Sequence, residues 1–105
     1  MKDERVSMKK KFGGEVQLSI AEILEHTKEL ECSCPEEVVQ ILRAVRSLID
    51  QQRTCLLENP RGVVVHTWLA GEALQLESGV VRILCELLQR ENILNSDLEF
   101  QQKIF

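Results

Sequence analysis

The stretch that decides the predicted fold runs from Thr67 to Phe105 and has the sequence TWLAGEALQLESGVVRILCELLQRENILNSDLEFQQKIF. Its apolar spacing predicts a short helix, a turn near 75–78 and a longer helix over 78–91. Alternation of apolar and polar residues then predicts a small terminal β-hairpin that turns at 95–97. No catalytic motif falls in this stretch. It therefore predicts an architecture rather than a chemistry.

The apolar skeleton of this stretch resembles that of winged helix-turn-helix domains. The matching residues are Leu69, Ala70, Val80, Leu84, Leu87, Ile93 and Leu94. Asn92 stands where such domains usually place a glycine after the recognition helix, and asparagine is the next best residue for a left-handed cap. The turn at 75–78 departs from the family because it lacks a glycine. The resemblance implies a winged-helix-like C-terminal half, and the alternative is a plain helical hairpin followed by a strand.

In a winged helix, the exposed face of helix 78–91 enters the major groove of DNA. The candidate nucleic-acid residues, on this helix and near the N-terminus, are Lys9, Lys10, Lys11, Arg82, Gln89 and Arg90. Affinity for DNA comes largely from phosphate contacts made by lysine and arginine. Over residues 62–105 the cations are Arg82, Arg90 and Lys103, and acids outnumber them. DNA binding by a transcription-regulator-type protein is therefore the second hypothesis, disfavoured by charge.

The clearest helix signal lies upstream, over residues 35–57. Apolar residues follow a three-four spacing there, Pro35 suits a first helical turn, and two glutamates after it complement the helix dipole. Such a helix is roughly 33 Å long, more than a small domain needs. It therefore predicts either the spine of the fold or a dimer seam. The residues of that seam would be Leu42, Val45, Ile49 and Leu56, which are equally suited to an intramolecular core.

The domain organisation follows from these elements and from the chain length of 105 residues, which fits one domain. Residues 1–14 are expected to be a flexible basic leader that ends at Gly13-Gly14. Residues 15–105 are expected to be a single globular domain, with a helical part over 15–58 and a winged-helix-like part over 63–105. The expected fold class is mainly α with a small β component.

Two shorter patterns complete this prediction. Ser19 and Glu22 form a capping box, which predicts a helix over about 20–30. Val63-Val64-Val65 is a β-branched run of the kind found in short buried strands. His66, which follows it, is expected to be a hydrogen-bonded packing residue.

The charge is unevenly distributed along the chain. The net charge is −4, but residues 1–14 hold five cations and two acids, so this leader carries +3 and the other residues −7. An acidic body repels a polyanion. With no apolar run long enough to span a membrane and no signal-peptide pattern, we expect a cytoplasmic protein.

The four cysteines do not form a recognisable framework. Cys32 and Cys34 are one residue apart, whereas zinc sites favour wider spacing and need four ligands. A thiol or metal sensor that uses Cys32 and Cys34 is the third hypothesis. The sequence contains no phosphate loop, dinucleotide fingerprint or nucleophile with a clear partner. The first hypothesis is thus a non-catalytic protein–protein interaction module that self-associates and needs no cofactor.

Overall fold

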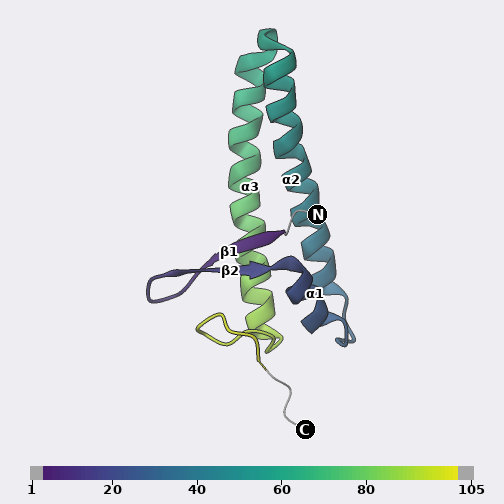
Figure 1. The fold of residues 1–105 in the computed structure, drawn as a ribbon, viewed down its shortest axis with the longest axis vertical. Helices are drawn as coiled ribbons and strands as arrows, with labels where there is room; N and C mark the ends of the chain where they lie inside the picture. The colour runs from purple at the N-terminus through teal and green to yellow at the C-terminus, as the bar shows by residue number, and fades with distance from the viewer. Residues whose placement is uncertain (1–3, 102–105) are drawn as a thin grey trace.

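The fold is an antiparallel pair of long helices with a small sheet and a short helix packed across one end (Figure 1). The structure is a computed structural model and describes residues 4–101. Helix α2 spans Cys34–Glu58, α3 spans Val63–Arg90, and a 3-10 turn at Pro60–Gly62 joins them. Helices of 25 and 28 residues are about 37 and 42 Å long. They account for the elongated shape, which measures 59 × 29 × 23 Å.

The prediction of a helix over 35–57 is confirmed by α2. Its first turn contains Pro35 and two glutamates, as the sequence indicates. One face of α2 is buried, against α3 along most of its length and against the sheet end at its start. The buried residues of this face are Pro35, Val39, Leu42, Val45, Ile49 and Gln52.

Helix α3 corrects two predictions. Val63–Val65 begins this helix and is not a strand. The expected turn at 75–78 is wrong, because α3 continues through these residues without interruption, so the helix-turn-helix part of the winged-helix resemblance is not seen. The two errors have different causes. The β-branched run costs less than about 0.7 kcal/mol per residue in a helix, so it can form the exposed first turn of α3. Through 75–78 the helix continues because Ala73 and Val80, seven residues apart, are buried on one face of α3.

A two-stranded antiparallel sheet crosses α3 near the base of the helix pair (Figure 1). Strand β1 spans Arg5–Lys9 and β2 spans Glu15–Ser19. Residues 5–9 thus differ from the flexible leader expected over 1–14. Within β1, Val6 and Met8 are buried while the alternate side chains are exposed, so one face of the sheet adds to the core. Gly13 and Gly14 turn the chain, with φ angles of 94° and 84° that favour glycine.

Helix α1 spans Ile20–Thr27 and lies between β2 and the start of α2. The capping box that predicts it is half formed, since the Glu22 N–H donates to Ser19 Oγ at 3.4 Å. The helix ends three residues before the predicted limit, where Thr27 Oγ1 donates to the Leu24 carbonyl. Ile20 and Ile23 are fully buried and join the base of the core.

The C-terminus of α3 ends in a Schellman motif. Asn92 has a φ of 60°, which confirms the left-handed cap predicted at this residue. Its N–H donates to the Gln89 carbonyl at 3.1 Å, and the Ile93 N–H donates to the Leu88 carbonyl at 2.8 Å. The buried Ile93 and Leu88 supply the apolar contact that accompanies this motif.

After the cap, the chain folds back under the base. Asn95 Oδ1 accepts hydrogen bonds from the N–H groups of Asp97 and Glu99, at 2.9 and 3.0 Å, which confirms the turn expected at 95–97. Leu94 and Phe100 form an isolated antiparallel bridge, so the predicted wing is reduced to one pair in residues 4–101. Ile104, expected in the second wing strand, lies outside the described residues.

The cap at Asn92 yields a stability prediction. Replacing Asn92 with alanine should lower the free energy of unfolding by about 1 kcal/mol, because the left-handed conformation is costly for alanine, whereas the short polar side chain of asparagine tolerates it. An Asn92→Gly variant should be at least as stable as the wild type. Urea denaturation would measure both. Glu91→Ala is the control, since Glu91 has an ordinary φ of −86°; equal stability of the alanine and glycine variants would contradict the prediction.

Near the far end of the helix pair, a polar contact replaces apolar packing. Gln52 is buried, and its Oε1 lies 2.6 Å from Nδ1 of His66. This contact fits the expectation of a hydrogen-bonded packing histidine. Gly62 is needed beside it, because a Cβ atom at that position would approach the His66 ring to 2.7 Å.

Candidate functional site

The face of the helix pair opposite the sheet carries a second set of apolar side chains, which we call the second seam. It consists of Ile41, Leu48 and Cys55 on α2 and Leu69, Leu76 and Ile83 on α3. Within each helix these residues are seven apart. Because seven residues complete almost two turns, each set forms one line along its helix. Such a repeat is typical of helices that pack against other helices.

The position of the second seam follows from the contacts that α2 and α3 make with the sheet. Val81 and Cys85 lie against β1, and Ile83 is two residues from each. Two residues correspond to about 200° of rotation, so Ile83 faces away from the sheet. On α2, Arg46 reaches toward β1 and Leu48 is two residues beyond it. The two lines of apolar residues therefore share the face that the sheet leaves uncovered.

Several members of the second seam are exposed to solvent. Ile41, Leu76 and Ile83 are 53%, 54% and 48% exposed, and the other three members are half-buried. Single exposed apolar residues are normal on a protein surface, but a contiguous line of them usually marks an interaction site. The second seam is therefore the strongest candidate for contact with another molecule.

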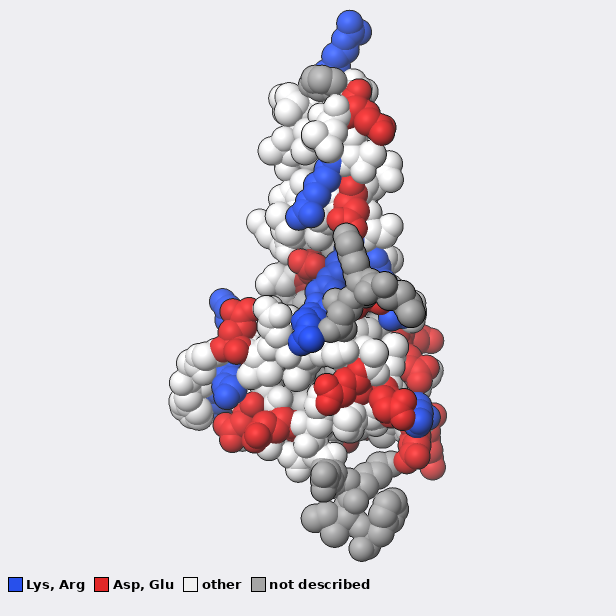
Figure 2. Space-filling view, in the orientation of Figure 1, with Lys and Arg blue, Asp and Glu red and all other residues white. Residues whose placement is uncertain are grey.

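The tip of the helix pair extends this apolar surface. Leu57, Val64 and Trp68 are all more than 60% exposed, and Val65 lies next to them. On the side that bears the sheet, charged side chains gather around the lower half of the molecule, while the upper half of the helix pair is mostly uncharged (Figure 2). The exposed Glu58 and Arg61 also lie at the tip, so an apolar contact there would have to leave these charges in water.

The residues predicted for a dimer seam have a different place in the fold. Leu42, Val45 and Ile49 are at most 6% exposed and pack in the core of a single chain, and Leu56 is half-buried. They hold α2 against its own α3. The sequence signal for the second seam was the seven-residue spacing from Ile41 to Cys55, which runs beside the stronger core pattern.

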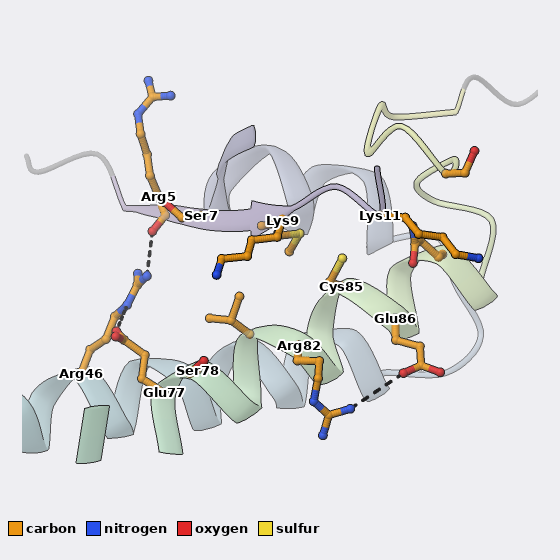
Figure 3. Close-up of a pocket in the computed structure, with 14 residues that line it drawn as sticks. Arg5, Ser7, Lys9, Lys11, Arg46, Glu77, Ser78, Arg82, Cys85 and Glu86 are labelled. Atoms are coloured by element: carbon orange, nitrogen blue, oxygen red, sulfur yellow. Dashed lines mark hydrogen bonds and ion pairs between the residues drawn. The ribbon is translucent and has the colours of Figure 1, made fainter. Parts of the chain in front are cut away.

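On the sheet side, a groove lies between β1 and α3 (Figure 3). We call it the basic groove. Its floor includes Met8, Val81 and Cys85, and it has a volume of about 970 Å³. Its charged lining residues are Arg5, Lys9, Lys11, Arg46, Arg82, Glu77 and Glu86. Five cations against two acids leave a local charge of +3, although the chain as a whole carries −4.

The basic groove brings together residues that the nucleic-acid hypothesis took from two separate parts of the chain. Lys9 and Lys11 come from the expected leader, and Arg82 and Gln89 from the expected reading helix. Lys10 and Arg90 do not line the groove. Arg90 instead lies along α3 with its Nη2 atom 2.8 Å from Oε1 of Glu86, and this ion pair lowers the pKa of Glu86.

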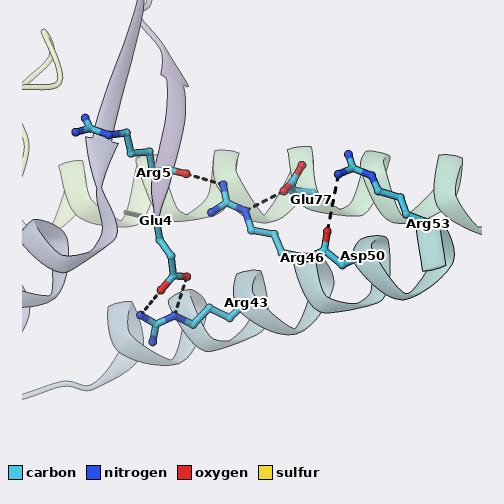
Figure 4. Close-up of polar contacts among 7 residues, drawn as sticks. All are labelled: Glu4, Arg5, Arg43, Arg46, Asp50, Arg53 and Glu77. Atoms are coloured by element: carbon cyan, nitrogen blue, oxygen red, sulfur yellow. Dashed lines mark hydrogen bonds and ion pairs between the residues drawn. The ribbon is translucent and has the colours of Figure 1, made fainter. Parts of the chain in front are cut away.

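An ion-pair network joins β1 to both long helices (Figure 4). Arg43 donates to both carboxylate oxygens of Glu4, at 3.0 and 3.1 Å. Arg46 donates to Glu77 on α3 at 3.0 Å and to the backbone carbonyl of Arg5 at 2.8 Å. These contacts fix the position along the helix pair at which β1 crosses it.

The four cysteines are not gathered into one site in the described part of the chain. Cys32 and Cys34 are exposed just before and at the start of α2, where the Cys34 N–H contacts the Cys32 sulfur at 3.3 Å. The Cys32 thiol raises the pKa of Cys34, and burial raises the pKa of Cys85. Between residues 4 and 101, no three metal-binding side chains lie close enough together to hold an ion.

Comparisons with protein-family models, with curated proteins and with solved structures found no match for this chain. No helix within residues 4–101 is long and apolar enough to cross a membrane.

Proposed function

We propose that this chain is a non-catalytic interaction module that self-associates through the second seam. Two copies would pack their uncovered helix faces together, so that the two helix pairs form a four-helix arrangement. The observation that carries this proposal is the pair of exposed apolar lines on one face, with Ile41 on α2 and Leu76 and Ile83 on α3 about half exposed.

The size of this face supports a second copy as the occupant. Two helices, each about 10 Å wide and about 40 Å long, present a face of about 800 Å². A standard protein–protein interface buries about 800 Å² on each partner. A two-fold dimer brings the same patch of both copies together, and an apolar line of this kind is complementary to itself.

The composition of the face supports helix–helix packing. Three of the intervening positions hold small or uncharged residues, namely Ala44, Gln51 and Gly79, whereas Glu72 between Leu69 and Leu76 is charged and exposed. The ion pairs of Arg43 and Arg46 lie on the sheet side, where they stay clear of the second seam. Association would therefore bury apolar surface without desolvating either ion pair.

Sedimentation equilibrium over a wide concentration range would test this proposal. We expect a monomer–dimer equilibrium for the wild type. An Ile83→Glu variant should weaken dimerisation about 100-fold, because each copy would bury a carboxylate at a cost of more than about 1 kcal/mol. Gln75→Glu is the matched control, since Gln75 is exposed on the same helix but outside the second seam.

Two results would contradict self-association by this face. One is a wild-type protein that stays monomeric at millimolar concentration. The other is an equal effect of Ile83→Glu and Gln75→Glu on the dimerisation constant. Far-UV circular dichroism would check that each variant keeps its helices. We expect that it does, because Ile83 lies outside the core of the chain.

A further inference from the structure

The strand β1 has an open edge, and the pairing register identifies the backbone groups on it. Lys10 N–H donates to the Gly14 carbonyl, and Ile20 N–H donates to the Glu4 carbonyl. Antiparallel pairs alternate between hydrogen-bonded and non-hydrogen-bonded positions. Positions 5, 7 and 9 are therefore the non-hydrogen-bonded ones, and their N–H and C=O groups point away from β2.

The contact of Arg46 agrees with this assignment. Its guanidinium donates to the Arg5 carbonyl from the side away from β2. In the described structure, the next outward groups along the edge, those of Ser7 and Lys9, have no such partner. They lie along the basic groove, so the groove contains a short row of backbone donors and acceptors.

The surroundings of this edge differ between its two sides. On the solvent side of the sheet, Arg5, Ser7 and Lys9 are exposed. On the helix side, Leu74 is 50% exposed and lies one turn before Ser78, which lines the groove. A strand added to the edge would have alternate side chains directed to these two sides. One set would meet cations, and the other would meet a mixed helix surface whose apolar contacts are Val81 in the groove and Leu74 beside it.

We propose that the open edge of β1 binds an extended peptide segment in which acidic residues alternate with apolar ones. The peptide backbone would pair with Ser7 and Lys9, as in other cases of strand addition to a sheet edge. Its acidic side chains would lie beside Arg5 and Lys9, and opposite charges on neighbouring strands stabilise such pairing. Its apolar side chains would contact α3 near Leu74.

A second copy of β1 fits this edge less well. Antiparallel pairing of two β1 strands about Ser7 would place Arg5 opposite Lys9 of the other copy at both ends. Like charges directly opposite each other are destabilising, and lysine on an edge strand is a known deterrent to such pairing. A nucleic acid is also less favoured for two reasons. It has no peptide groups that could pair with the edge, and Glu77 and Glu86 would face its phosphates.

Amide hydrogen exchange of the whole chain, followed by NMR, would test strand addition directly. The probe is a capped seven-residue peptide of alternating glutamate and valine. We expect the amides of Ser7 and Lys9 to exchange at least about tenfold more slowly with the peptide present, because they become hydrogen-bonded. Val6 and Met8 should not change, since they already pair with β2. Peptide binding without slower exchange at Ser7 and Lys9 would overturn the proposal.

Two further comparisons separate pairing from simple charge attraction. Two probes, one N-methylated at the glutamates and the other at the valines, each block one edge of the peptide. At least one of them should lose binding, and unchanged affinity of both would overturn the proposal. Lys9→Glu should weaken binding of the parent peptide about tenfold, as expected for the loss of a charge-assisted contact. Lys28→Glu is the matched control, at the residue that follows α1 and outside the groove; an equal loss in both variants would overturn the proposal.

Two more probes define the ligand and its independence from self-association. A random-sequence oligonucleotide should bind more weakly than the peptide at physiological salt, and tighter binding would overturn the choice of a peptide. The Ile83→Glu variant should bind the peptide as the wild type does, because the second seam and the basic groove lie on opposite sides of α3. A loss of peptide binding in that variant would overturn the assignment to the β1 edge.

Discussion

A Val6→Asp variant should lose about 3–5 kcal/mol of unfolding free energy, the range measured for an uncompensated buried charge. Val6 is fully buried between the sheet and the helices. A carboxylate there must either stay unpaired among apolar side chains or pull β1 away from the core. In the second case the fully buried Met8 would also be exposed. Either outcome removes much of the stability of a domain whose total is about 5–15 kcal/mol.

Ser7→Asp is the control for this prediction, because Ser7 is the next residue of β1 and points to solvent. We expect it to change stability by less than about 0.5 kcal/mol. Urea denaturation followed by circular dichroism would measure both variants. Similar stabilities would show that residues 5–9 are not held in the core, as expected of the flexible leader that the sequence predicted.

A Leu84→Ala variant should lose about 2–5 kcal/mol of unfolding free energy, since removal of a fully buried leucine side chain leaves a cavity. Leu84 has no exposed surface. It lies on α3 within the core at the base, where the sheet and the two long helices meet. Loss of its methyl groups should therefore weaken several elements together.

Leu57→Ala tests the same chemical change at a site without packing. Leu57 is 85% exposed at the tip, so we expect a loss of less than about 0.5 kcal/mol. Thermal and urea unfolding at low protein concentration would measure both variants without a contribution from self-association. A loss at Leu57 as large as that at Leu84 would contradict the core described above.

The elements that could be predicted are those whose signals are local. The start of α2 depends on Pro35 and the glutamates after it, and its apolar face depends on three-four spacing. The cap at Asn92 depends on a residue type that tolerates a positive φ. Each of these signals lies within one or two helical turns of the structure that it specifies.

The elements that the sequence did not predict depend on contacts between distant segments. Strand β1 is stable because Val6 and Met8 reach a core made largely by helices far along the chain. The alternation of Val6 and Met8 with polar residues is a strand pattern, but nothing within residues 1–14 indicates which core it packs against. In the same way, packing against α2 carries α3 through the position of the expected turn.

For each of the two candidate surfaces, the sequence predicted some of the residues but not how they come together. Of the basic groove's cations, Lys9, Lys11 and Arg82 were predicted as candidate residues, whereas Arg5 and Arg46 were not. Lys9 and Arg82 were assigned to different parts of the molecule, because their meeting depends on how β1 crosses α3. The apolar residues Ile41 and Leu48 were recognised as part of α2. That Ile41 is exposed and Leu48 lies at the margin of the core became clear only once Leu42 and Ile49 were seen to pack inside the chain.

The sheet covers only one side of the helix pair, and this asymmetry bears on valency. Two copies joined through the second seam would carry their β1 edges on the two outer sides of the assembly, facing in opposite directions. One short ligand could not reach both edges, so the pair would gain no avidity from a single compact partner. It would instead act as a cross-linker that draws two separate acidic chains toward each other.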